Sequence, residues 1–270
     1  MTGTTLPAKG IRWGPIRGTP LLRVGSRDPT LVAADIHIGL SWTSPRGANP
    51  PQGDPLELAE RLLHGLAESR GSALLIVGDV KDPIAPTPWF VRRQVREFFQ
   101  RLLDEGIRVE VVPGNHDAGL SRMVPEGVVI HPLSGLLRGT VGYFHGHAWP
   151  SREILERASV LVTGHLHPGF RLAPSEARSR TGKEPCWIRV RCPPAATPPK
   201  GARRTRHPPP RAREIVVLPA FNPLCAGEAL NREAPHRGRR FLVRHFLSRG
   251  EARAYLLDGT DLGPLTWGLA

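Results

Sequence analysis

Short apolar runs alternate with amphipathic segments along the first half of the chain. Residues 30–37 and 73–78 are apolar over the length of a strand, which is typical of buried strands. Residues 54–69 and 88–106 each carry an apolar stripe at helical spacing. With a third strand over 109–112, the order is βαβαβ, which predicts parallel strands with helices covering them.

The second half of the chain is richer in short apolar runs and contains one clear helical segment. This helix is expected over 151–158, with Ser151 as its N-cap. The expected strands are 128–130, 136–144, 160–163, 215–218 and two more within 240–257, around a turn at 248–251. A core of two packed sheets with helices outside accommodates both halves, so the sequence predicts an α/β fold.

A basic, proline-rich stretch interrupts this pattern. Residues 173–213 hold nine prolines, and residues 171–213 carry twelve Lys or Arg against two Glu, or +10 of the chain's net +13. Because proline cannot donate to strand ladders or continue helices, we expect an extended or disordered excursion, with room for a short strand at 186–191. The prediction is one domain over 1–270 with a flexible insertion at 174–213.

Composition excludes several classes of protein. Apolar residues make up 40% of the chain, enough for a sizeable core, and no apolar run approaches the length that crosses a bilayer. The N-terminus shows no signal peptide, and three cysteines are too few for a disulfide framework. We therefore expect a protein of the reducing cytoplasm without a membrane partner.

Five polar motifs each follow an expected strand, and four of them contain histidines. In chain order they are Asp35-Ile36-His37; Gly78-Asp79-Val80-Lys81-Asp82; Gly114-Asn115-His116-Asp117; His145-Gly146-His147; and Gly164-His165-Leu166-His167. One such cluster alone would be an ordinary solvated turn. Five in this order indicate a common site, because strand ends in α/β sheets present their side chains to one crevice.

The residue types in these motifs point to metal chemistry. Carboxylate, imidazole and amide oxygen are ligands of first-row divalent metals, and no cysteine lies within the motifs. Seven such donors exceed the need of one ion, whereas two ions that share a bridging carboxylate would use them all. A pair of ions is the clamp that enzymes use for in-line phosphoryl displacement.

The five motifs, in this order, resemble those of the calcineurin-like metallophosphoesterase superfamily. Residues 34–39, 145–150 and 218–224 are similar to its ICC-like phosphoesterase branch. The resemblance covers most of residues 31–231 except the basic stretch, onto which nothing is carried over. It implies a metallo-dependent phosphatase-like sandwich of two sheets flanked by helices, in the layer order α/β/β/α.

The resemblance also implies a role for each motif residue. The first metal would be held by Asp35, His37 and His167, the second by Asn115, His145 and His165, and Asp79 would bridge both. His116 would act on the phosphate and the leaving group without binding metal, and the Asp82 carboxylate would orient it through its far nitrogen. Manganese is the expected ion, with iron, zinc, nickel and cobalt as alternatives.

The expected activity is that of a metal-dependent phosphoric ester hydrolase in which a hydroxide that bridges two ions attacks phosphorus. The motifs do not separate monoesterases from phosphodiesterases or nucleases. The basic segment favours nucleic acid, although an arginine-rich insertion without a binding role is an equal alternative. The alternative function is a nucleic-acid-binding or scaffold protein with this fold and little or no hydrolysis.

Several other residues are expected to have structural roles. We expect His147 to support the site without binding metal, because the first histidine of its motif is the family's ligand. Asp117 and Asn222 are interpreted as turn or capping residues, although the resemblance would also allow Asn222 near the site. The aromatic residues of 89–99 lie at helical spacing, so we expect core packing there instead of base stacking.

Overall fold

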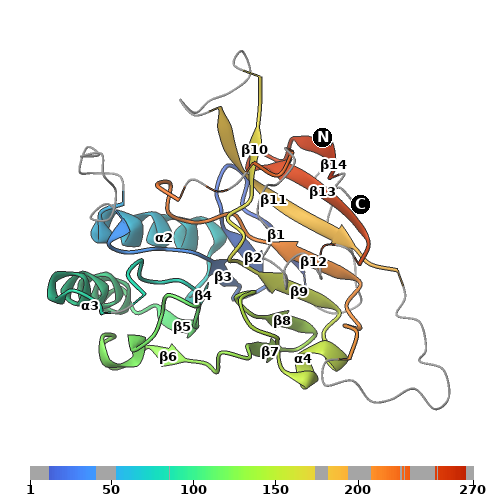
Figure 1. Ribbon diagram of the computed structural model, residues 1–270. Helices are drawn as coiled ribbons and strands as arrows, with labels where there is room; N and C mark the ends of the chain where they lie inside the picture. The colour runs from blue at the N-terminus through green and yellow to red at the C-terminus, as the bar shows by residue number, and fades with distance from the viewer. Residues whose placement is uncertain are drawn as a thin grey trace.

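The computed structural model describes residues 12–40, 53–84, 86–173, 182–193, 208–225, 227, 229–231, 247 and 249–265. Two β-sheets pack face to face at its centre (Figure 1). The strands are β1 Trp13–Pro15, β2 Leu22–Val24, β3 Thr30–Ala33, β4 Ala73–Val77, β5 Arg108–Val112, β6 Val129–Ile130, β7 Leu136–Arg138, β8 Val141–Tyr143, β9 Val160–Thr163, β10 Gly169–Arg171, β11 Lys183–Arg191, β12 Glu214–Val217, β13 Glu251–Leu256 and β14 Asp261–Pro264. The helices are α2 Pro55–Ser69, α3 Trp89–Asp104, α4 Arg152–Arg157 and the 3₁₀ turn η1 Leu120–Arg122.

The first sheet has the order β1-β2-β3-β4-β5-β6, and its strands β3 to β6 run parallel. Helices α2 and α3 cover its outer face (Figure 1). The α2 helix begins where Asp54 accepts hydrogen bonds from the main-chain N–H groups of Leu56 and Glu57. The predicted βαβαβ order is confirmed. The antiparallel strands β1 and β2, which the sequence pattern did not predict, extend the sheet at one edge.

Strand β4 shows why its sequence is a continuous apolar run. Leu74 and Ile76 pack toward α2 and α3, while Leu75 and Val77 pack toward the second sheet. All four side chains are buried, as in parallel strands covered on both faces. The site residues that follow β4 are therefore attached to one of the most rigid parts of the core.

The second sheet has the order β14-β13-β11-β12-β9-β8-β7, and β10 pairs with β11. Helix α4 packs on its outer face, where Ile154 and Leu155 meet Leu161 and Ile215. Ser151 caps α4 as predicted, since its side chain accepts from the N–H of Ile154. The layers are therefore helix, sheet, sheet and helix, which confirms the predicted α/β/β/α sandwich.

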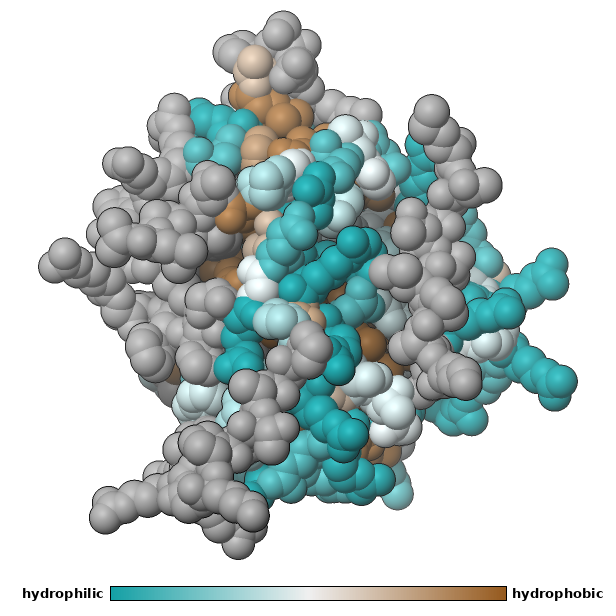
Figure 2. All heavy atoms as spheres, turned by 90° about the vertical axis from the view of Figure 1, so that its right-hand side faces the viewer, coloured by the Kyte–Doolittle hydropathy of each residue, from teal (hydrophilic) through white to brown (hydrophobic). Residues whose placement is uncertain are grey.

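Hydrophilic residues form a band across the face seen in Figure 2.

The stretch predicted to be one continuous insertion at 174–213 contains an integral strand. Strand β11 lies between β12 and β13, and Cys186, Trp187, Ile188 and Val190 are buried along it. The prediction placed at most a short strand here, because prolines surround the apolar residues. Residues 174–181 and 194–207 lie outside the described residues.

The C-terminal hairpin also differs from its prediction. Residues 249–250 form the expected turn region, but β13 pairs with the later strand β14, and the two are connected around Gly259. Residues 240–246, the first half of the predicted hairpin, lie outside the described residues.

We propose that 1–270 form one domain, supported by the shared core between the sheets. Among the described helices, none has the length and apolar character of a membrane span.

Candidate metal centre and active site

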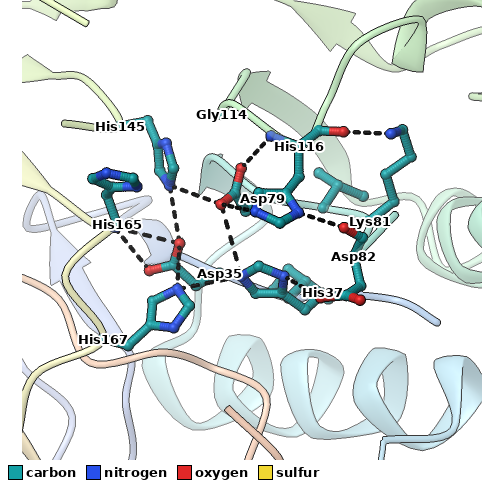
Figure 3. A network of polar contacts seen from close by, with 12 residues as sticks. Asp35, His37, Asp79, Lys81, Asp82, Gly114, His116, His145, His165 and His167 are labelled. Carbon is teal, nitrogen blue, oxygen red and sulfur yellow. Dashed lines mark hydrogen bonds and ion pairs between the residues drawn. The ribbon is translucent and has the colours of Figure 1, made fainter. Parts of the chain in front are cut away.

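The predicted metal ligands gather where the carboxyl ends of the parallel strands of both sheets meet (Figure 3). Their positions follow the chain order of the strands: Asp35 and His37 follow β3, Asp79 follows β4, Asn115 follows β5, His145 follows β8, and His165 and His167 follow β9. The fold therefore brings together residues that are as much as 132 positions apart in sequence, from Asp35 to His167.

Two glycines allow this close approach. A Cβ atom on Gly78 would lie 2.1 Å from the imidazole ring of His145, and one on Gly114 would lie 2.1 Å from Oδ1 of Asp79. Both distances are far below van der Waals contact. The glycines of two of the motifs are therefore needed for the loops to meet.

The backbone at the ligands is unusual as well. Among the described residues, six non-glycine residues have a left-handed φ, and five of them are predicted metal ligands: Asp35, His37, Asp79, His165 and His167. This conformation costs energy for residues with a Cβ, and it clusters at functional sites. These five left-handed residues follow three of the strands, β3, β4 and β9.

The ligand atoms fall into two groups that share Asp79. In the first group, ligand atoms of Asp35, His37, Asp79 and His167 all lie within 4.8 Å of one another. In the second, those of Asp79, His145 and His165 do so. Nε2 of His37 and Nε2 of His145 lie 3.7 and 3.6 Å from the same oxygen, Oδ2 of Asp79.

Asn115, the remaining predicted ligand, directly follows β5. Its Oδ1 atom is buried and has no hydrogen-bond partner in the structure, a condition that is costly for a buried polar atom. A divalent cation would satisfy it, because amide oxygens ligate such ions. The chemistry of the seven predicted donors therefore fits two metal ions that would share Asp79.

The Asp82 carboxylate lies close to two imidazoles, since its ligand atom and those of His37 and His116 are within 4.8 Å of one another. Its Oδ1 atom lies 3.1 Å from Nδ1 of His37, whereas Nδ1 of His116 contacts the main-chain oxygen of Asp82. A carboxylate can only accept, so Nδ1 of His37 is the donor, and Nε2 is left free to bind metal. Burial alone would lower the pKa of His37, but this hydrogen bond and the charge of Asp35 raise it.

His116 lies close to the predicted ligands, and its ring is grouped with His37 and Asp82 instead of with the two groups that share Asp79. Its main-chain N–H donates to Oδ1 of Asp79 over 2.9 Å, and its Nε2 lies 3.8 Å from Oδ2 of the same residue. The side chain is 24% exposed, in contrast to the buried Asp79. A substrate can therefore reach it from solvent.

Comparison with known proteins agrees with this geometry. The family model of calcineurin-like phosphoesterases matches residues 29–185, more than half of the chain. The chain belongs to this family. A search of curated proteins found no match to it.

Solved structures similar to this chain include the Pseudomonas putida nuclease MPE, with a TM-score of 0.52 and 18% identity over 93% of this chain and 100% of that one. They also include Yfce, a phosphoesterase from E. coli, with a TM-score of 0.36 and 15% identity over 87% of this chain and 97% of that one. The first similarity agrees with the sandwich fold.

His147 contacts the predicted ligand His145. Its Nδ1 lies 3.0 Å from Nδ1 of His145, so one of the two nitrogens donates to the other. Burial, assisted by the charge of His145, lowers the pKa of His147 to about 4. His147 is therefore neutral at pH 7 and can accept the Nδ1 proton of His145, which directs Nε2 of His145 toward the metals.

Two residues brace the loops of this site. Asp117, predicted to be a turn residue, is buried and accepts hydrogen bonds from the main-chain N–H groups of Val80, Lys81 and Gly114. It therefore joins the loop after β4 to the loop after β5. Sequence reasoning gave Lys81 no role, but it is fully buried, and its ammonium donates to main-chain oxygens of both loops. Its position between Asp79 and Asp82 was the only signal.

Sequence reasoning also missed Cys225. Its sulfur and ring nitrogens of His37 and His167 lie within 4.8 Å of one another, so a cysteine does contribute to this site. Burial and the carboxylates of Asp35 and Asp82 raise the pKa of its thiol well above the usual value. The thiol is therefore protonated unless a cation offsets those charges.

The charge states of Asp35 and His165 suit metal binding. Burial alone would raise the pKa of Asp35, but the imidazoles of His167 and His145 hold it well below its usual value. Burial lowers the pKa of His165 to about 4, and the charge of His145 acts in the same direction. At neutral pH the centre therefore offers an ionised Asp35 and a neutral His165, the forms that bind metal.

Proposed function

We propose that this member of the family is a two-metal-dependent phosphoesterase, and that it acts as a phosphodiesterase or nuclease on nucleic acid. The observation that carries the proposal is the position of Asp79, which belongs to both groups of ligand atoms. A shared carboxylate holds two cations close together, as in the two-metal sites of phosphatases and nucleases.

In this proposal each ion has its own set of protein ligands. Asp35, His37 and His167 would hold the first ion and Asn115, His145 and His165 the second, with Asp79 shared. When bound, the ions would activate a water molecule as nucleophile and neutralise charge on the phosphate oxygens. Manganese is the proposed ion, as the resemblance implies; the carboxylate and amide oxygens suit it, whereas the imidazoles would also suit zinc, iron or nickel.

His116 supplies the proton chemistry in this proposal. Its Nδ1 contacts the main-chain oxygen of Asp82, so the ring cannot turn freely, and Nε2 is the atom that faces the site. A protonated Nε2 would stabilise charge on the phosphoryl oxygens and give its proton to the leaving oxygen. The exposed fraction of the side chain supports direct contact with substrate.

The choice of nucleic acid as substrate has two supports. The Pseudomonas putida protein with a similar fold is a nuclease. The chain carries a net charge of +13, of which residues 171–213 contribute +10, and such a concentration of arginine attracts a polyphosphate backbone.

The cysteines at 186, 192 and 225 are free thiols, which supports the proposed reducing, cytoplasmic setting.

A substrate panel tests this function. The full chain, freed of metal with EDTA and then supplied with Mn²⁺, is assayed on p-nitrophenyl phosphate, bis-p-nitrophenyl phosphate, and single- and double-stranded DNA. We expect hydrolysis of the diester and cleavage of DNA, both abolished by EDTA. Hydrolysis of the monoester alone would contradict the choice of nucleic acid. Salt-sensitive DNA binding without any hydrolysis would favour the nucleic-acid-binding alternative.

A further inference from the structure

The thiol of Cys225 lies at one of the two groups of ligand atoms and not at the other. Its sulfur is grouped with ring nitrogens of His37 and His167, both of which belong to the first group. The second group combines Asp79, His145 and His165, and no cysteine of the described residues joins it. The two candidate metal sites therefore differ in chemistry.

The position of Cys225 is fixed by the loop that follows β12. The main-chain N–H of Cys225 donates to the carbonyl oxygen of Asn222 over 3.0 Å. The side chain of Asn222 is 1% exposed, and its Nδ2 donates to the carbonyl oxygen of Ile36 over 2.9 Å. Because Ile36 lies between Asp35 and His37, the loop that carries the thiol is attached directly to the loop that carries two ligands.

The same asparagine stabilises its own loop. Oδ1 of Asn222 accepts from the main-chain N–H of Leu224 over 2.9 Å, and the N–H of Phe221 donates to the carbonyl oxygen of Ala34. The chain from 221 to 225 is thus hydrogen-bonded along the start of the Asp35 motif. The thiol is therefore carried by a hydrogen-bonded loop and lies next to the imidazoles of His37 and His167.

A sulfur ligand changes which metal a site selects. Thiolate is a soft ligand that favours zinc, iron and cobalt, whereas manganese prefers carboxylate, amide and water oxygens. An imidazole and carboxylate set with one added sulfur should therefore hold zinc or cobalt more tightly than the same set without it.

We propose that Cys225 is an additional ligand of the first metal ion and makes that site prefer thiophilic ions, while the second site keeps only nitrogen and oxygen ligands. The inference rests on the proposed two-metal centre. On binding, the sulfur–metal bond forms as the S–H proton leaves to solvent. The centre would then be able to hold two different metals, a thiophilic ion beside Cys225 and a manganese ion beside Asn115.

Cobalt reports directly on this arrangement, because a thiolate bound to Co²⁺ gives a charge-transfer absorption in the near ultraviolet. The EDTA-treated full chain is titrated with Co²⁺ alone, together with Cys225→Ser and the control Cys192→Ser. Cys192 is a half-buried thiol at the end of β11, packed against the cluster on the outer face of the second sheet. We expect the absorption in the wild-type chain and in Cys192→Ser, and its loss in Cys225→Ser.

Competition between metals gives the size of the effect. Cys225→Ser should weaken binding of Zn²⁺ at the first site by about 10-fold or more, on the scale of other changes around metal ligands. Binding of Mn²⁺ should change less. An equal effect on both ions would overturn the proposal, since a soft ligand must discriminate between them.

The outcomes separate this inference from the proposed function. Two bound Co²⁺ ions without the absorption would overturn the role of Cys225 and leave the two-metal centre intact. No bound Co²⁺ would overturn both. If Cys225→Ser does not fold, alkylation of the wild-type chain by iodoacetamide decides the matter: Zn²⁺ must slow modification of Cys225 and leave Cys192 unaffected, and equal rates with and without Zn²⁺ would contradict the inference.

Discussion

The proposed role of His116 depends on a single ring nitrogen, Nε2. Its main-chain N–H and its Nδ1 are both engaged, so only Nε2 is available for proton transfer. We expect His116→Gln to lower kcat toward bis-p-nitrophenyl phosphate by at least ~10²-fold, as is typical when a general acid is lost. Both metals should remain, as measured by elemental analysis. Loss of metal from this variant would mean that His116 is a ligand.

Asp82 has a different expected effect, because its carboxylate contacts Nδ1 of the predicted ligand His37. Asp82→Asn should weaken metal binding at the first site by roughly 10–100-fold, since the hydrogen bond that orients His37 is altered. Calorimetric titration of the EDTA-treated chain measures this. The matched control is Asp104→Asn at the exposed end of α3, where Asp104 accepts from Gln100. Equal affinities in the two variants would contradict the assignment.

At the scale of elements, β11 is the strand whose structure differs most from what the sequence pattern predicted. Ile188 is fully buried on this strand, and Arg191 is exposed at its end. Ile188→Ala should lower the free energy of unfolding by about 2–5 kcal/mol, as other large-to-small changes in a core do. Arg191→Ala should change it by less than about 0.5 kcal/mol. Urea denaturation measures both, and a small effect at Ile188 would support the flexible insertion instead.

The elements also show what the sequence can predict. The helices at 55–69 and 89–104 and the strand at 73–77 follow from periodicity, because each segment has one consistent pattern over its whole length. Strand β11 was underestimated because prolines at 185, 193 and 194 flank its buried residues. Strands β1 and β2 are three residues each, too short for periodicity to detect.

The candidate site, like the fold, could be predicted from the sequence only in part. The motifs predicted that nine residues meet at strand ends. Eight of them have ligand atoms in groups within 4.8 Å, and the ninth, Asn115, directly follows β5. The partner of Asp82 and the approach of Cys225 could not be predicted. Both depend on how a loop from one strand crosses a loop from another, and no local pattern in the sequence records that crossing.

At the scale of the whole molecule, one charged cluster joins the two sheets. Glu110 on β5 of the first sheet accepts from Arg138 on β7 of the second and pairs with His131 over 2.6 Å. Burial alone would raise the pKa of Glu110, but Arg138 and His131 lower it from its usual value. The ionised carboxylate is therefore favoured in the folded state.

This shift predicts how stability depends on pH. Since the pKa of Glu110 is lower in the folded state than in the unfolded state, its stabilisation is complete above the unfolded value of 4.5 and is lost as the pH falls through the folded value. Glu110→Gln should cost about 1 kcal/mol at pH 7, and the gap to the wild type should narrow as the pH falls below the unfolded value of 4.5. Thermal unfolding across pH measures it, with the exposed Glu97→Gln as control. A gap that does not vary with pH would contradict the charge assignment.

Metal stoichiometry measured together with turnover is the most direct test of a two-metal centre that shares Asp79. Mn²⁺ is titrated into the EDTA-treated chain while bound metal and hydrolysis of bis-p-nitrophenyl phosphate are followed, for the wild type and for Asp79→Asn. Asparagine tolerates the left-handed backbone at this position, where φ is 47°, so the variant tests the carboxylate and not the fold. We expect wild-type turnover to rise as the second ion binds, with about two ions per chain at saturation. Asp79→Asn should bind one ion or none and be inactive. Full turnover with one ion, or an active Asp79→Asn variant, would contradict the shared-carboxylate centre.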